Sequence, residues 1–184
     1  MSRNFRNRCS TGLRAEIPRG YFEVGVFHPK HEVNIGTLMR SSWQLGASGI
    51  FTIGRRYKRQ NSDTVNILDK LPISEFKTFE EFYSHGIPRG CRIIAIEQGG
   101  TPLSTFSHPL LGIYLLGAED HGLPKNVVDQ CHEVVSLESV RTNSFNVAVS
   151  GSIVMYHRFL QYGRITETNK ETKYANDYRN RKTI

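Results

Sequence analysis

Three short clusters of polar and glycine residues carry the side chains that could do chemistry. They are HPKHEVNIGTLMR, LLGAEDHGLP and SLESVRTNSFN, at 28–40, 115–124 and 136–146. The first contains Asn34 and Arg40, and the second contains Gly117 and Glu119. A guanidinium can hold a phosphate or stabilise an oxyanion, whereas an amide and a carboxylate can orient a bound molecule. Because glycine lets the backbone approach a ligand closely, these clusters predict a site for binding and positioning.

Other kinds of chemistry find less support in the residues. His28 with His31, and Cys131 with His132, could each supply two metal ligands, but neither pair has a second pair at a suitable spacing. Nothing near Cys131 marks a stabilised thiolate. No GxGxxG motif follows an apolar strand, and no GxxxxGK[ST] motif occurs, which argues against Rossmann and P-loop nucleotide sites. We therefore expect no metal and no cysteine nucleophile.

The elements that position these clusters read as strands alternating with helices. Apolar runs predict strands at 23–29, 49–54, 73–78, 91–98, 112–119 and 133–137. Helices are predicted at 34–46, 79–86, 124–131 and 144–162. Asn34 is expected to cap the first helix, and Gly46 to end it. The alternation predicts an α/β fold whose parallel sheet is flanked by helices, and ligands of such sheets bind beyond the carboxyl ends of the strands.

Positive charge is concentrated in a few places. The formal net charge is +7 and the isoelectric point is near 9.5. The loop GRRYKRQ at 54–60 is predicted to bind RNA through its four cationic side chains, Arg55, Arg56, Lys58 and Arg59. Clustered cations attract polyanions and accelerate the encounter with them. Solubility is the alternative interpretation of this charge.

The length of 184 residues suits one domain with a sizeable core. We expect a basic N-terminal arm at 1–20, the domain itself at 21–162 and a charged tail at 163–184. No apolar run reaches the roughly 18 residues of a membrane helix. The three cysteines are odd in number and widely spaced, so the expected location is the cytoplasm.

The three clusters, in this order, resemble the three motifs of the SpoU–TrmH family of RNA methyltransferases, which belongs to the SPOUT class. The first motif is Asn-x-Gly followed by Arg, matched by Asn34, Gly36 and Arg40. The second is an apolar strand that ends in Gly-x-Glu-x-x-Gly-Leu, matched by LLGAEDHGL, and the third is matched by SFNV at 144–147. The resemblance spans about residues 22–162.

The resemblance implies an S-adenosylmethionine-dependent enzyme that methylates a ribose 2′-oxygen of RNA. The expected substrate is tRNA, and rRNA is the alternative. The resemblance also implies a homodimer, and a deep trefoil knot made by the C-terminal segment. The expected catalytic residues are Arg40, Asn34 and Glu119. The expected cofactor-binding residues lie in the later strands and in the third cluster, and they are Ile96, Gly117, Ser136, Leu137, Ser144 and Asn146.

Two features of the chain qualify what the resemblance implies. A guanidinium has a pKa above about 12, so we expect Arg40 to hold a phosphate and stabilise the oxyanion rather than to remove a proton. Family members often carry Ile-Pro-Met before the third motif, whereas this chain has Ser136, Leu137 and Glu138. Glu138 thus places an acid where an apolar side chain is usual.

Two other functions stay open from the sequence alone. One is a catalytically inactive, knotted RNA-binding protein, which binding of S-adenosylmethionine would argue against. The other is an unrelated α/β enzyme that acts on a small acidic substrate, which an absence of RNA binding at moderate salt would favour.

Overall fold

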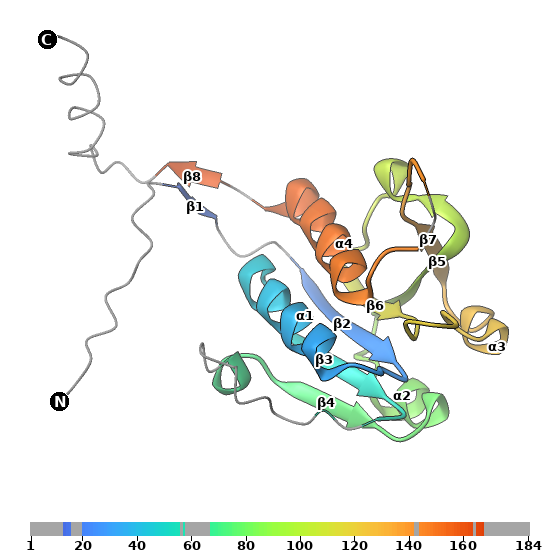
Figure 1. Cartoon of the computed structure of the whole chain (residues 1–184). Helices are drawn as coiled ribbons and strands as arrows, with labels where there is room; N and C mark the ends of the chain where they lie inside the picture. The colour runs from blue at the N-terminus through green and yellow to red at the C-terminus, as the bar shows by residue number, and fades with distance from the viewer. Residues whose placement is uncertain are drawn as a thin grey trace, which may run out of the picture.

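Six parallel strands form the main sheet of the computed structural model, in the order β4-β3-β2-β6-β5-β7 (Figure 1). The strands are β2 (Tyr21–Phe27), β3 (Gly49–Ile53), β4 (Ile73–Phe76), β5 (Arg92–Pro102), β6 (Leu111–Leu116) and β7 (Glu133–Ser136). The structure describes residues 13–15, 20–55, 57, 67–141, 144–163 and 165–167. After β2 the chain continues to β3 and β4 on one side of the sheet, whereas after β6 it passes β5 and continues to β7 on the other side, so the direction of the connections reverses between β2 and β6.

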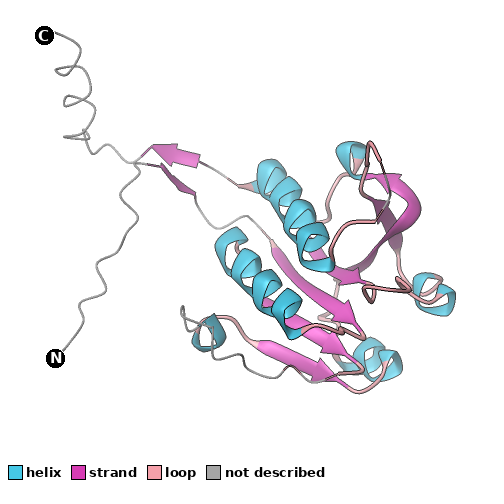
Figure 2. Cartoon of the chain, in the orientation of Figure 1, coloured by secondary structure: helices cyan, strands magenta, loops and turns pink. Residues whose placement is uncertain are grey.

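Helices cover both faces of this sheet (Figure 2). On one face α1 (Glu32–Leu45) and α4 (Val147–Tyr162) pack side by side, and they share a buried apolar cluster with the sheet. On the other face, α2 (Phe79–His85) and α3 (Lys125–Val128) pack over a second cluster. Two short 3-10 turns, η1 (Ile67–Asp69) and η2 (Leu103–Thr105), complete the described helical elements. The predicted α/β fold, a parallel sheet flanked by helices, is confirmed.

The buried stretches of the central strands, such as Ile93–Ile96 of β5, are apolar on both faces because helices cover both sides of the sheet. In β5, Ile94 and Ile96 point into the cluster beneath α1 and α4. Their neighbours Ile93 and Ala95 point into the cluster beneath α2 and α3. Successive side chains of a strand face opposite sides, so a strand covered by helices on both sides has no polar face.

Several predicted boundaries are wrong by a few residues. α1 begins at Glu32 after His31, so Asn34 lies in the first turn of the helix and is not its N-cap. β6 ends at Leu116 rather than at 119, because Gly117 begins a tight loop. β5 continues to Pro102 through an irregularity in its register with β7 between Ile96 and Thr101. Gly46 does end α1, with the left-handed φ of 81° that favours glycine.

The second half of α4 is fastened to the segment that leads into β6. Arg158 is fully buried and donates hydrogen bonds to the carbonyls of Pro109 at 2.6 Å and Leu110 at 2.9 Å. His108 is also buried, and its ring contacts the Tyr114 hydroxyl at 2.6 Å and His157 Nδ1 at 2.9 Å. Burial, together with electrostatic interactions with His157 and Arg158, lowers the pKa of His108 to about 3. The ring is therefore neutral at neutral pH.

The described ends of the chain pair with each other, away from the main sheet. β1 (Leu13–Ala15) and β8 (Ile165–Glu167) form a two-stranded antiparallel ribbon (Figure 1). The rest of the expected arms lies outside the described residues, apart from Gly20 and Gly163.

In the described part of the chain, no helix is both long and apolar enough to cross a membrane. The trefoil knot stays a prediction.

Candidate functional site

Side-chain hydrogen bonds join the three polar clusters at the carboxyl ends of the strands. Asn34 Nδ2 donates to Glu119 Oε1 at 2.9 Å. Asn146 Nδ2 donates to Asn34 Oδ1 at 3.0 Å. Residues separated by 85 and 112 positions in the chain thus form one continuous chain of hydrogen bonds. The start of α1, the loop after β6 and the start of α4 are held together by it.

The orientation of each amide in this chain follows from its neighbour. Asn146 is the N-cap of α4, and its Oδ1 accepts from the backbone N–H groups of Ala148 at 2.9 Å and Val149 at 3.4 Å. Its Nδ2 is therefore the group that faces Asn34, and Asn34 must accept with Oδ1 and donate with Nδ2. Only an acceptor can end such a chain, and the Glu119 carboxylate meets this requirement.

Glu119 also stabilises the turn that leads into α1. Its carboxylate accepts from the backbone N–H groups of Lys30 at 3.0 Å and His31 at 3.4 Å. Burial alone would raise the pKa of Glu119, but the hydrogen bonds from Asn34, Lys30 and His31 outweigh burial and lower it. Next to it, Asp120 forms an ion pair with the Lys30 ammonium. The loop after β6 and the loop after β2 are thereby fixed to each other across adjacent strands.

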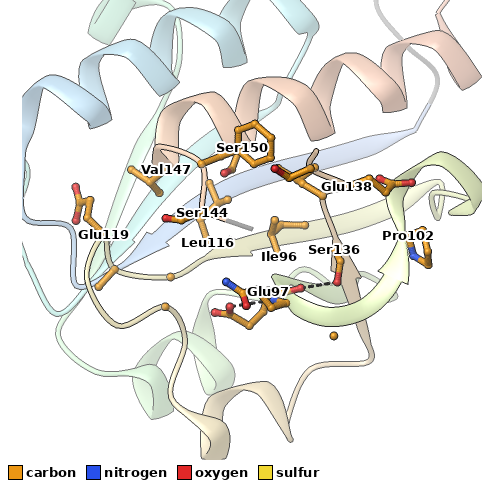
Figure 3. A pocket seen from close by; sticks show the side chains of 18 residues that line it. Ile96, Glu97, Pro102, Leu116, Glu119, Ser136, Glu138, Ser144, Val147 and Ser150 are labelled. Carbon is orange, nitrogen blue, oxygen red and sulfur yellow. Dashed lines mark hydrogen bonds between the residues drawn. The ribbon is translucent and has the colours of Figure 1, made fainter. Parts of the chain in front are cut away.

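A cavity of about 450 Å³ opens beside this hydrogen-bond chain, at the carboxyl ends of β5, β6 and β7 (Figure 3). Its described lining combines an apolar floor with polar walls and comprises Ile96, Glu97, Gln98, Gly99, Pro102, Leu116, Gly117, Ala118, Glu119, Gly122, Ser136, Leu137, Glu138, Ser139, Ser144, Phe145, Val147 and Ser150. Its volume falls within the range of small-molecule sites, about 300–1,000 Å³. It lies on the β6 side of the point where the strand order reverses, which is where ligands of open α/β sheets bind.

Gly117 is required by the close crossing of two backbone segments in the wall of this cavity. Ala118 and Gly122 form an isolated antiparallel bridge, which folds the loop after β6 back on itself. A Cβ atom at position 117 would lie 2.3 Å from the carbonyl carbon of Gly122. Since that neighbour is backbone, it cannot rotate away, and any larger residue would force the loop open.

The opposite wall is held by the residues that depart from the family pattern. Ser136 Oγ donates to the carbonyl of Glu97 at 2.9 Å and accepts from the Gly100 N–H at 2.7 Å. Glu138 Oε1 accepts from the Ser104 N–H at 3.1 Å. Ser136 thus ties the end of β7 to the irregular end of β5, and Glu138 ties the segment after β7 to η2. Polar residues at these positions therefore form the wall with hydrogen bonds in place of apolar packing.

Most of the predicted catalytic and cofactor-binding residues come together here, although Asn34, Asn146 and Arg40 do not line the cavity. Ile96, Gly117, Ser136, Leu137, Ser144 and Glu119 all line it. Asn146 is not among the lining residues, because its side chain is used to cap α4 and to bind Asn34. Arg40 lies on the exposed face of α1 and makes no hydrogen bond or ion pair with the described residues.

The predicted RNA-binding loop is described only at Gly54, Arg55 and Tyr57. Arg55 Nη1 donates to the carbonyls of Pro29 at 3.2 Å and Lys30 at 2.5 Å, so this side chain supports the turn before α1. Arg56, Lys58 and Arg59 lie outside the described residues. Their role in RNA binding stays a prediction.

The sequence did not assign Glu97, Gln98, Gly99 and Pro102 to the site. They reach it because β5 bends at its irregularity and carries its last residues along the cavity. The polar and glycine-rich run EQGGTP, directly after a buried apolar strand, was the available signal.

The alternative chemistries are not favoured by the geometry. Burial raises the pKa of Cys131 to about 11, so its thiol is protonated at neutral pH and is a poor nucleophile. Among the described residues, no group of three or more His, Cys, Asp or Glu side chains is placed to hold a metal ion.

Replacing Asn146 with alanine should lower the free energy of unfolding by about 1 kcal/mol, because α4 loses its N-cap acceptor. Urea unfolding followed by circular dichroism would measure this. Asn146→Asp should recover most of the loss, since aspartate caps equally well, and Asn126→Ala on the exposed surface of α3 is the matched control. Equal stability of Asn146→Ala and Asn126→Ala would contradict the capping role.

Comparison with known proteins finds a matching family, curated relatives and solved structures of similar fold. The model of the SpoU rRNA Methylase family matches residues 21–156. A curated protein of Archaeoglobus fulgidus, described as an uncharacterized tRNA/rRNA methyltransferase, is 27% identical over 149 residues, which cover 78% of this chain and 66% of that protein. A Mycobacterium bovis protein of the same description is 25% identical over 146 residues, 76% of this chain and 45% of that protein. The chain thus spans about half to two thirds of the length of these relatives.

Solved structures share the fold at lower identity. An AdoMet-bound rRNA methyltransferase from Sinorhizobium meliloti superposes with a TM-score of 0.69 at 22% identity, covering 79% of this chain and 59% of that one. A protein solved for insights into the 2-OH methylation of C/U34 on tRNA superposes with a TM-score of 0.67 at 21% identity, covering 77% of this chain and 96% of that one.

Proposed function

Because this chain belongs to the SpoU rRNA Methylase family, we propose that it transfers a methyl group from S-adenosylmethionine to a ribose 2′-oxygen of RNA, and of tRNA rather than rRNA. The observation that carries the proposal is the cavity at the carboxyl ends of β5, β6 and β7. It is bounded by the second and third clusters and tied to the first through Asn34 and Glu119. The preference for tRNA is supported by the match to the protein from the C/U34 study, which covers 96% of that chain, against 59% of the Sinorhizobium meliloti rRNA methyltransferase.

The residues that line the cavity fit this cofactor. Ile96, Leu116 and Leu137 offer an apolar surface for an adenine ring, and the folded loop at Gly117 brings backbone groups close to it. Carboxylates suit the cationic end of the cofactor, and the hydroxyls of Ser139, Ser144 and Ser150 can donate to its carboxylate.

Methyl transfer depends mainly on how the protein positions the cofactor and the ribose. When bound, S-adenosylmethionine supplies an electrophilic methyl group, whose bond to sulfur breaks as the bond to the ribose oxygen forms, leaving a neutral thioether and releasing the hydroxyl proton. Asn34 and Glu119 hold the loops around the cavity in register. Arg40 holds a phosphate next to the reacting ribose and stabilises the negative charge that develops on its oxygen.

The proposal is tested by incubating the chain with methyl-labelled S-adenosylmethionine and either bulk tRNA or bulk rRNA. A methylated 2′-oxygen cannot attack the neighbouring phosphate, so the label should remain in alkali-stable dinucleotides from tRNA. Label in the mononucleotides would contradict the 2′-oxygen assignment, and label in rRNA alone would contradict the tRNA assignment. RNA binding without any transfer would favour the inactive RNA-binding protein instead.

We also propose that the protein is a homodimer in the cytoplasm. The surface of α4 supports the dimer. Four exposed apolar residues, Val149, Ile153, Tyr156 and Leu160, recur at helical spacing along one face. With Thr37 of α1 they border a shallow hollow of about 490 Å³. Arg40 lies one helical turn beyond Thr37, so a dimer through this face would hold Arg40 at the subunit boundary.

Sedimentation should therefore give a mass of about 42 kDa, twice that of the 21.0 kDa chain. Tyr156→Asp should convert the dimer to a monomer, because it places an unpaired charge in an apolar interface. Tyr83→Asp is the control, since Tyr83 on α2 is also exposed and also packs on a phenylalanine. A wild-type monomer at micromolar concentration would rule out the dimer.

A further inference from the structure

Three carboxylates from three separate segments line the cavity (Figure 3). Glu97 stands at the irregular end of β5, Glu119 follows β6 and Glu138 follows β7. None of the other described lining residues is Lys, Arg or His. The cavity is therefore acidic, although the chain as a whole carries a net charge of +7.

The partners of these carboxylates hold them in place without neutralising them. Glu97 accepts from the N–H groups of Leu123 at 2.8 Å and Gln98 at 3.0 Å. Glu138 accepts from the N–H of Ser104 at 3.1 Å, and this hydrogen bond lowers the pKa of its carboxyl. Amide N–H groups stabilise the ionised form but bring no net positive charge. No ion pair to a described Lys or Arg is formed by any of the three.

From this arrangement we propose that the acidic lining makes the cavity selective for the sulfonium cofactor over its uncharged thioether product. The inference rests on the proposed function and deepens it. S-adenosylmethionine and S-adenosylhomocysteine share the adenosine and the amino acid, and they differ by one methyl group and one positive charge. An acidic cavity attracts the additional charge, so the field of Glu97, Glu119 and Glu138 would favour exchange of the spent product for fresh cofactor.

The size of this selectivity depends on how strongly water screens the charge of the carboxylates. One additional unit charge among three partly solvated carboxylates should gain about 1.4 kcal/mol in all, which is a factor of about ten in affinity. The positive charge disperses as the methyl group leaves, so the same field favours binding rather than the chemical step. Removing the Glu97 or Glu138 carboxylate should therefore raise KM for the cofactor.

Calorimetry with S-adenosylmethionine and with S-adenosylhomocysteine, on the full chain, measures the selectivity directly. The wild-type chain should bind the sulfonium compound roughly tenfold more tightly. Glu138→Gln should reduce that ratio by about twofold, and Glu97→Gln with Glu138→Gln by about fivefold, which leaves the share of Glu119. Glutamine keeps one acceptor oxygen, so Glu138→Gln can retain the hydrogen bond from Ser104, whereas Glu97→Gln can retain only one of the bonds from Gln98 and Leu123. Melting temperatures measure what this costs the walls.

Glu133→Gln is the matched control, because it removes the same charge at the other end of β7, where Glu133 pairs with Arg92 outside the cavity. Its selectivity should equal that of the wild type. If both compounds bind equally to the wild type, or if the ratio is unchanged in the double variant, the inference is wrong while the proposed function stands. If neither compound binds the wild type, the proposed function fails and the inference fails with it.

Discussion

Arg40→Ala should methylate RNA at least about 100-fold more slowly than the wild-type chain, while its affinity for RNA changes little. The guanidinium lies on the exposed face of α1 and has no hydrogen-bond or ion-pair partner among the described residues, so it is available to a phosphate and to the developing oxyanion. An interaction that stabilises mainly the transition state changes the rate of turnover when it is lost. RNA affinity changes little, because Arg40 supplies one phosphate contact among many.

Single-turnover methylation and filter binding separate the two quantities. Arg40→Lys should recover only part of the rate, because an ammonium keeps the charge but not the two-pronged geometry of a guanidinium. The opposite behaviour is expected when Arg56, Lys58 and Arg59 are neutralised together with Arg55 left in place. RNA affinity should fall and its salt dependence should flatten by roughly one unit per lost phosphate contact. Normal turnover in Arg40→Ala would rule out its catalytic role.

Arg158→Ala should lower the free energy of unfolding by about 3–5 kcal/mol. The side chain is fully buried, and its guanidinium carbon lies 4.9 Å from the centre of the Phe22 ring and 4.8 Å from that of Tyr162. Its removal leaves a cavity between the two rings and deprives the carbonyls of Pro109 and Leu110 of their donors. A buried polar group left without a partner costs its full desolvation penalty.

Urea unfolding measures this effect, with Arg92→Ala as the control. Arg92 is half exposed and its ion pair with Glu133 lies on the surface, so its loss should cost less than about 1 kcal/mol. Arg158→Lys should fall between the two variants, since an ammonium lacks the planar face that stacks between the rings. Equal stability of Arg158→Ala and Arg92→Ala would show that α4 does not depend on this contact.

The sequence by itself determined the order of strands and helices, because periodicity and burial are local properties. Strands such as 91–98 and 112–119 are apolar on both faces only when helices cover both sides, which led directly to the parallel sheet. The three polar clusters could likewise be placed at one edge of that sheet, since the carboxyl ends of parallel strands share an edge. Gly46 was identifiable because its role depends only on neighbouring backbone.

Only the tertiary structure decided which partner each polar side chain takes. Asn34 looked like a helix cap, yet it binds Glu119 and Asn146, which are distant in the chain. Glu138 looked out of place, yet it binds the Ser104 N–H, which the bend at the end of β5 brings within reach. A local sequence pattern predicts a helix or a strand. A hydrogen bond between two such elements also depends on the register of the strands and on the course of the loops. Those follow from the packing of the whole chain.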